Sequence, residues 1–195
     1  MRQNSPSPAS RSVQIGSHRL DGTLSVPALA EGLVIFAHGS GSSRSSPRNT
    51  RVARGLNARR LATLLFDLLT ENEAADRANV FDIPLLGARV AEAISWARQD
   101  GETARLPIGL FGASTGAAAA LVAAAKAPDK VAAVVSRGGR PDLAGDHLPR
   151  VRAPTLLIVG GADFGVIELN EQALAALGCE KRLEIVPGAT HLFEE

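Results

Sequence analysis

The sequence contains no tyrosine, one tryptophan and one cysteine, and aromatic residues make up only 4% of its 195 residues. The single cysteine, Cys179, excludes an intramolecular disulfide, which favours a location in the reducing cytoplasm. Cys179 precedes a charged segment rather than lying in a glycine-rich turn. We therefore interpret it as a structural residue and not as a catalytic thiol.

The sequence also has no excess of charge of either sign, because 21 basic and 20 acidic residues give a formal net charge of +1. This balance attracts neither nucleic acid nor an anionic membrane, so neither is expected as a partner. Hydrophobic residues make up 45% of the chain, which is ordinary for a globular protein, and the length fits a single domain.

The first residues contain no apolar segment of the kind that a signal peptide requires. We expect residues 1–12 to be a disordered tail and residues 13–195 to form the folded domain. The uncharged run at 106–125 is long enough to span a bilayer, but a proline and several glycines interrupt it. We interpret this run as a strand, a turn and a buried helix.

Apolar segments alternate with segments of helical periodicity along the rest of the chain. The predicted strands cover residues 13–15, 20–26, 32–37, 61–66, 106–111, 131–135, 155–159 and 182–186, and the predicted helices lie near 49–60, 90–97, 116–127 and 168–177. The alternation predicts an α/β fold with a mostly parallel, doubly wound sheet and helices on both faces. Such sheets bind ligands beyond the carboxyl ends of their strands, which makes the residues after each strand informative.

The strongest local pattern is Gly112-Ala113-Ser114-Thr115-Gly116, which follows a predicted strand and precedes an alanine-rich helix. A serine on a sharp strand-to-helix turn needs small neighbours, and both glycines meet this need. The turn raises the hydroxyl above the sheet edge, at a helix N-terminus that stabilises negative charge. Without this context the serine would indicate only a turn; with it, Ser114 is predicted to be a nucleophile.

A serine nucleophile requires a base, and the base requires a carboxylate that orients it. Asp163 follows the strand at 155–159 through a glycine turn, and His191 follows the last predicted strand through a loop. Taken singly, Asp163 has an alternative as a helix N-cap, and His191 has an alternative as a solvated residue. The order Ser114, Asp163, His191 at three strand ends predicts a catalytic triad.

The loop that begins with His38 and Gly39 is predicted to complete the site. Acyl transfer needs two backbone N–H groups directed at the developing oxyanion, one of them from the residue after the nucleophile. We assign these groups to Thr115 and Ser40, with Gly41 as the alternative to Ser40. For His38 we predict a role in bracing the loop rather than in catalysis.

Together these motifs resemble the α/β-hydrolase superfamily, and within it the small dienelactone-hydrolase-like branch with little or no cap. The matching segments are the loop at 38–41, the elbow at 112–116, the turn at 160–163 and the segment at 188–191. Two departures stand out. Ser114 occupies the place of the cysteine nucleophile of dienelactone hydrolases, and the sequence ends at Glu195. We therefore expect a domain without the closing helix that members usually carry after the histidine.

Other classes of site fit the sequence less well. The glycine- and serine-rich stretch at 39–44 lacks the Gly-Lys-Ser/Thr of a phosphate-binding loop. The glycines at 109, 112 and 116 lie past mid-chain rather than in the first βαβ unit, and no tyrosine is present to serve a short-chain dehydrogenase. The histidines are scattered without the spacing of metal ligands. We therefore expect no cofactor and no metal.

The resemblance implies a carboxylic ester hydrolase that acts on a small-molecule ester or related acyl substrate through an acyl-enzyme intermediate. A thioesterase, an acyltransferase or a peptidase would use the same residues, and a non-catalytic binding protein of this fold is the remaining alternative. Arg137, with Arg140 nearby, is a candidate for binding a substrate carboxylate, against the alternatives of a solvated side chain or a structural ion pair. Residues 68–86 are expected to form a small flap over the site. The sequence does not determine whether the chain forms a homodimer.

Overall fold

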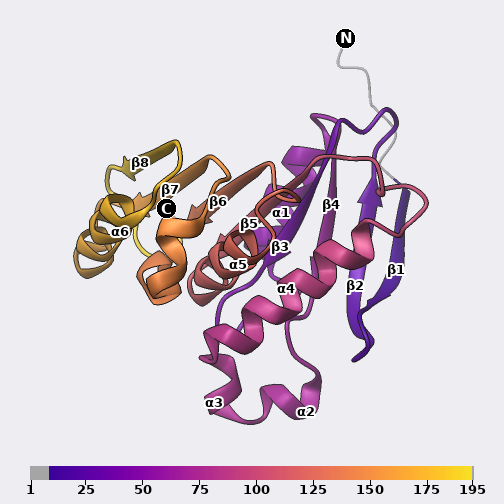
Figure 1. Cartoon of the computed structure of the whole chain (residues 1–195), viewed down its shortest axis with the longest axis horizontal. Coiled ribbons are helices and arrows are strands. Elements are labelled where there is room, and N and C mark those ends of the chain that lie inside the picture. The colour runs from indigo at the N-terminus through magenta and orange to yellow at the C-terminus, as the bar shows by residue number, and fades with distance from the viewer. Residues whose placement is uncertain (1–8, 195) are drawn as a thin grey trace.

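The computed structural model describes residues 9–194 and contains one eight-stranded sheet with helices on both faces (Figure 1). The strands are β1 (Ala9–Ile15), β2 (Leu20–Val26), β3 (Gly32–Ala37), β4 (Leu61–Phe66), β5 (Ile108–Ala113), β6 (Ala133–Arg137), β7 (Thr155–Gly160) and β8 (Lys181–Val186). The helices are α1 (Pro47–Asn57), α2 (Glu71–Ala74), α3 (Arg77–Val80), α4 (Ile83–Ala97), α5 (Thr115–Lys126), the 3₁₀ segment η1 (Pro141–Arg150) and α6 (Phe164–Ala176). The predicted α/β class is confirmed.

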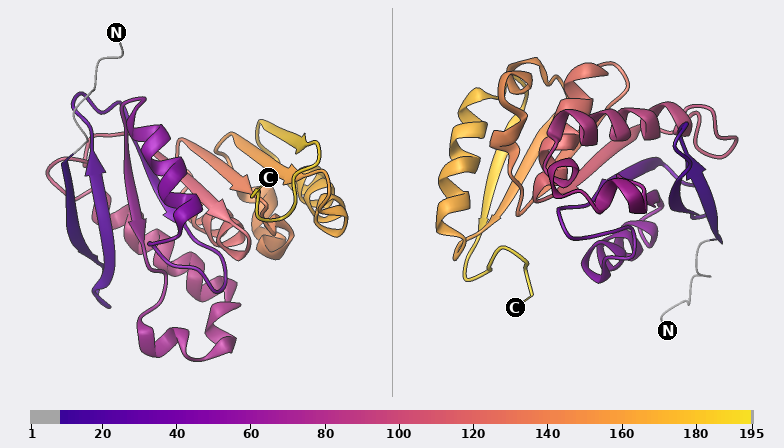
Figure 2. Two further views of the ribbon diagram at one scale, coloured as in Figure 1. Left: turned by 180° about the vertical axis from the view of Figure 1, so that it is seen from behind. Right: turned by 90° about the horizontal axis from the view of Figure 1, so that it is seen from below.

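The strand order is β1-β2-β4-β3-β5-β6-β7-β8, and only β2 runs against the others. The strands from β3 to β8 are parallel, so their carboxyl ends meet at one edge of the sheet. Helices α4, α5 and α6 lie in front of the sheet in Figure 1, whereas α1 lies in front in the reversed view of Figure 2. This is the mostly parallel, doubly wound arrangement that the sequence predicted.

Helix α5 lies in the core and is buried from Thr115 to Ala124. Its many alanines are small, and α4 packs closely against it. The contact is so tight that a Cβ added at Gly87 of α4 would lie only 2.7 Å from the Cγ1 atom of Val122 in α5. The uncharged run at 106–125 therefore forms β5 and this buried helix, as predicted. No helix among residues 9–194 is long and apolar enough to cross a membrane.

The first strand of the sheet starts earlier than predicted. β1 begins at Ala9, which pairs with Val26, so residues 9–12 belong to the sheet and not to a disordered tail. The side chains of residues 9–12 are all exposed, and main-chain pairing with β2 holds this part of the strand. No apolar pattern therefore marks it in the sequence. Residues 1–8, the rest of the predicted tail, lie outside the described residues.

The strand at the opposite edge, β8, pairs with β7, and within residues 9–194 no other strand pairs with it. None of its six residues is buried. After β8 the described chain continues as turns and loop from 187 to 194, without a further helix.

Two glycines in helix interiors give a matched test of the packing between α4 and α5. A Cβ at Gly55 of α1 meets nothing within 4 Å, whereas a Cβ at Gly87 meets Val122. We expect Gly55→Ala to raise the free energy of unfolding by roughly 0.5–1 kcal/mol through helix propensity. We expect Gly87→Ala to lower it by about 1–3 kcal/mol through overpacking. Urea unfolding measures both changes, and an equal gain in the two variants would contradict the close approach.

Candidate active site

Ser114 occupies the sharp turn between β5 and α5. Its backbone has φ 51° and ψ −125°, a conformation that residues with side chains rarely adopt. A Cβ at Gly112 would lie 2.4 Å from the Cα atom of Ala117, and one at Gly116 would lie 2.1 Å from the carbonyl oxygen of Ala37. Both positions therefore require glycine, and the turn fixes the serine at the N-terminus of α5.

Asp163 and His191 meet beyond the carboxyl ends of β7 and β8. The Nδ1 atom of His191 lies 2.7 Å from Oδ2 of Asp163. With a carboxylate as its partner, Nδ1 carries the proton, which leaves the Nε2 lone pair to accept another. Asp163 stands at the N-cap position of α6, but its side chain makes no capping hydrogen bond. The aspartate carboxylate is directed to the histidine instead.

The loop that carries His191 lies directly on two glycines at strand ends. A Cβ at Gly160 would lie 2.3 Å from the carbonyl oxygen of Ala189. A Cβ at Gly138, whose φ is +50°, would lie 2.6 Å from the carbonyl oxygen of His191. The sequence analysis did not identify Gly138, although a pair of glycines two residues beyond a predicted strand is a signal that would have found it.

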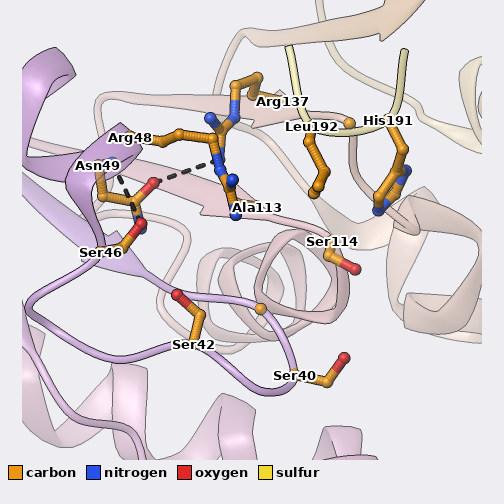
Figure 3. Close-up of a pocket in the computed structure, with 12 residues that line it drawn as sticks. Ser40, Ser42, Ser46, Arg48, Asn49, Ala113, Ser114, Arg137, His191 and Leu192 are labelled. Carbon is orange, nitrogen blue, oxygen red and sulfur yellow. Dashed lines mark hydrogen bonds between the residues drawn. The ribbon is translucent and has the colours of Figure 1, made fainter. Parts of the chain in front are cut away.

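Ser114 and His191 line one cavity of about 220 Å³ at this edge of the sheet (Figure 3). Among the described residues, no hydrogen bond joins the Ser114 hydroxyl to the imidazole of His191. The fold therefore brings the three predicted triad residues to one place, with the Asp163–His191 hydrogen bond formed and the serine in the shared cavity.

The predicted oxyanion loop passes close over the nucleophile, because a Cβ at Gly39 would lie 2.8 Å from the Cβ atom of Ser114. The backbone N–H of Ser40 donates to the side-chain hydroxyl of Thr115 at 3.0 Å, a contact that the sequence analysis did not predict. Thr115 is the first residue of α5, where backbone N–H groups have no partner within the helix. One of the two predicted oxyanion donors is thus already bonded to a side chain of the other.

His38 joins the oxyanion loop to the end of β4. Its Nδ1 atom donates to the Gly39 carbonyl at 3.0 Å, and its Nε2 atom accepts from the N–H of Leu68 at 3.1 Å. Both ring nitrogens are used, which agrees with the predicted bracing role. Burial lowers the pKa of His38 below its ordinary value, although the Gly39 carbonyl and the charge of Asp67 oppose this shift.

Two arginines, Arg48 of α1 and Arg137 of β6, line the same cavity as Ser114. Arg137 donates to the Oδ1 atom of Asn49 at 3.2 Å, lies 5.8 Å from the ring centroid of Phe111, and has a buried Nε without a partner. Burial and then the positive charge of Arg48 lower the pKa of Arg137. Arg48 forms an ion pair with Glu194.

The other predicted carboxylate ligand, Arg140, is engaged elsewhere. It forms a bidentate ion pair with Asp142, with distances of 2.9 and 2.8 Å, so the alternative of a structural ion pair describes it. The sequence analysis did not identify Arg48. Arg51 and Arg54 follow it at regular spacing on the same helix, so nothing in the sequence distinguishes Arg48 from them. Within the described part of the chain, no group of three or more His, Cys, Asp or Glu side chains is placed to hold a metal ion.

Comparison with known proteins assigns the chain to a family. The family model described as an alpha/beta hydrolase domain matches residues 30–195 of the chain. The chain belongs to the α/β-hydrolase family. A dienelactone hydrolase of Anabaena variabilis is 55% identical to it, with a TM-score of 0.92 over 98% of this chain and 91% of that chain. Est1E of Butyrivibrio proteoclasticus, 16% identical, shares the fold with a TM-score of 0.79 over 95% of this chain and 91% of its own. The predicted resemblance is confirmed.

This α/β hydrolase also matches part of two longer curated proteins. They come from two strains of Mycobacterium tuberculosis, are provisionally named phosphoribosyl transferases, and are 60% identical to the chain over 174 residues. The match covers 89% of the chain but 39% of each relative, so the chain spans about two fifths of their length. More than half of each relative therefore lies outside the match, and its name refers to the whole of that longer protein.

The half-buried His38, whose pKa is lowered, predicts that the stability of this α/β hydrolase depends on pH. Its pKa in the folded state is lowered below the unfolded value of about 6.5, so on acidification the unfolded chain binds a proton first. The contribution of His38 is complete above about pH 6.5 and is lost as the pH falls below that value. We expect the free energy of unfolding, measured with urea, to fall between about pH 7 and pH 5. The slope should be smaller in His38→Gln, and identical slopes would contradict the assignment.

Proposed function

We propose that this α/β hydrolase cleaves a carboxylic ester through an acyl-enzyme intermediate, with Ser114, His191 and Asp163 as its catalytic triad. The proposal depends on one observation above all. The 2.7 Å hydrogen bond between His191 and Asp163 lies beside the cavity that contains the Ser114 elbow. A carboxylate in this position holds a histidine in the tautomer that removes a proton from a serine hydroxyl.

In the proposed first step the Ser114 oxygen attacks the ester carbonyl carbon while Nε2 of His191 takes the hydroxyl proton. The carbonyl oxygen becomes negative, and the backbone N–H groups of Ser40 and Thr115 stabilise it together with the N-terminus of α5. The C–O bond to the alcohol then breaks as His191 gives its proton to the leaving oxygen. Water, activated by His191, attacks the acyl-enzyme, releases the acid and restores the serine.

We further propose that Arg137 binds a carboxylate on the alcohol side of the substrate. His191 must reach the leaving oxygen, and Arg137 lines the same cavity as His191, so this cavity receives the alcohol. Arg48 already pairs with Glu194, whereas among the described residues no ion pair involves Arg137. A substrate carboxylate supplies the counter-charge that a largely buried guanidinium lacks.

The same machinery would serve a thioesterase, an acyltransferase or a peptidase, and a protein of this fold that only binds its ligand would show no acyl-enzyme. We do not extend the name phosphoribosyl transferase to this chain, because the match covers only 39% of those relatives. The hydrolase and the pure binding protein are separated by a covalent probe, and the leaving groups are separated by a panel of esters, thioesters and amides.

Replacement of the nucleophile tests the central proposal. We expect Ser114→Ala to lower kcat on aryl esters by about 10⁴-fold, because the members of a triad act as a unit. Intact-mass measurement should show that a fluorophosphonate modifies the wild type once and does not modify Ser114→Ala. The exposed Ser45→Ala serves as the control and should keep both labelling and activity. Labelling of Ser114→Ala to the wild-type extent would contradict the assignment.

A second substitution tests the proposed carboxylate ligand. Arg137→Met should raise KM for para-acetoxybenzoate by about tenfold or more, because it removes a charge-assisted hydrogen bond. The uncharged phenyl acetate carries the same acyl group, and its KM should not change. Arg51→Met, on the exposed side of α1, is the control and should affect neither ester. An equal rise of KM for both esters would show that Arg137 does not recognise charge.

A further inference from the structure

A second cavity lies on the other side of the oxyanion loop. Its volume is about 380 Å³, and it shares Gly39, Ser40 and Ser42 with the active-site cavity. Part of its wall comes from the segment 68–86, in which α2 and α3 project away from the sheet (Figure 1). The flap predicted at 68–86 is therefore a pair of short helices that borders this second cavity and lines no part of the active-site cavity.

The wall of the second cavity is suited to hydrocarbon. Four aliphatic side chains contribute to it, namely Leu68, Leu69, Val80 and Leu86. Of the charged residues that line it, Arg44 and Asp67 form an ion pair with each other, and Glu71 is exposed. Arg48 and Arg137 line the active-site cavity, and among the described residues Arg137 has no ion-pair partner. One side of the loop thus offers an arginine without a counter-charge, whereas the other offers aliphatic side chains beside an arginine that Asp67 neutralises.

The boundary between the cavities runs through the hydrogen bond between Ser40 and Thr115. Ser114 lines only the active-site cavity, whereas the next residue, Thr115, lines only the second one. In the proposed reaction the substrate carbonyl oxygen takes the N–H of Ser40, which now donates to the Thr115 hydroxyl at 3.0 Å. Threonine in a helix has two accessible rotamers for its hydroxyl. Rotation of the Thr115 side chain to its other rotamer would free the Ser40 N–H for the reacting carbonyl and release the bond between the cavities.

The geometry of the reacting carbon decides which half of the ester faces which cavity. The leaving oxygen must lie near His191, which lines the active-site cavity together with Leu192. At the tetrahedral carbon on Ser114 the oxyanion faces the N–H groups of Ser40 and Thr115 and the leaving oxygen faces His191, so the acyl substituent takes the remaining direction. The second cavity adjoins this position, because Gly39, Ser40 and Ser42 line both cavities. We infer that the second cavity binds the acyl chain, so that the substrates are esters of aliphatic acids longer than acetic acid. This inference rests on the proposed ester hydrolysis.

The dependence of activity on the length of the acyl chain, measured with the 195-residue chain, tests the inference. With para-nitrophenyl esters from acetate to decanoate, kcat/KM should rise by up to about fourfold per added methylene until the cavity is full. Val80→Trp fills part of the cavity from α3 and should lower kcat/KM for octanoate at least tenfold, while acetate stays within twofold. The matched control is Ala78→Trp, an exposed position on the same helix that does not line the cavity. It should change neither value.

Ala74→Trp provides a second filling variant that does not depend on Val80, since Ala74 also lines the cavity and is exposed. Thermal unfolding of each variant checks that it folds. The inference is overturned if acetate and decanoate are cleaved equally well by the wild type, or if folded filling variants lose acetate and octanoate in the same proportion. Those outcomes leave ester hydrolysis intact. Absence of cleavage of every ester, together with absence of fluorophosphonate labelling, would instead refute the proposed function and this inference with it.

Discussion

The close packing of the N-terminus of α5 beneath the end of β3 is the constraint on which the site depends. At Gly116 the backbone of α5 is so near that an added Cβ would lie 2.1 Å from the Ala37 carbonyl oxygen and 2.5 Å from that of His38. This contact brings the oxyanion loop over the turn that holds Ser114. Any side chain at position 116 would push α5 away from β3 and increase the distance between Ser114 and Ser40.

His191 and Asp163, the proposed base and its carboxylate, reach this place from β8 and β7, which lie on the other side of β5 from β3 in the strand order. The loop with His191 lies on Gly138 and Gly160, and the carboxylate of Asp163 serves the histidine at the expense of a helix cap. The loop at 38–41 lies between a cavity lined by two arginines and a cavity lined in part by aliphatic side chains. This arrangement would suit an ester whose acyl and alcohol halves differ in polarity.

The parts that the sequence predicted are those with a short-range signal. The glycines around Ser114, the polar residues after β7 and β8, and the alternation of apolar strands with helices can each be read within a few residues. The parts that it missed depend on contacts between distant segments. The bond between Ser40 and Thr115 spans 75 positions, and the approach of Arg48 to Arg137 joins α1 to β6.

Two other differences have the same physical origin. The start of β1 is held by main-chain pairing and by polar contacts of Ser10 and Arg11, which leave no pattern of apolar side chains to read. The segment 68–86 was expected to form a flap over the active site, but it lines only the second cavity. Which cavity it borders depends on how α2 and α3 pack, and their sequences carry no signal for that. Periodicity therefore predicted the layers of the fold, whereas the lining of the cavities required the tertiary structure.

The position of β8 at the edge of the sheet makes one part of the site less stable than the other. This strand is bonded on one side only and buries none of its six residues, whereas α5 is enclosed by the core. Segments with so little burial separate from a folded protein at a smaller free energy than the core does. Detachment of β8 from the sheet would carry the following loop and His191 away, while Ser114 would stay in its turn. Ser114 and His191, the proposed nucleophile and base, thus belong to regions of unequal local stability, and the less stable region would limit how long the two residues stay together.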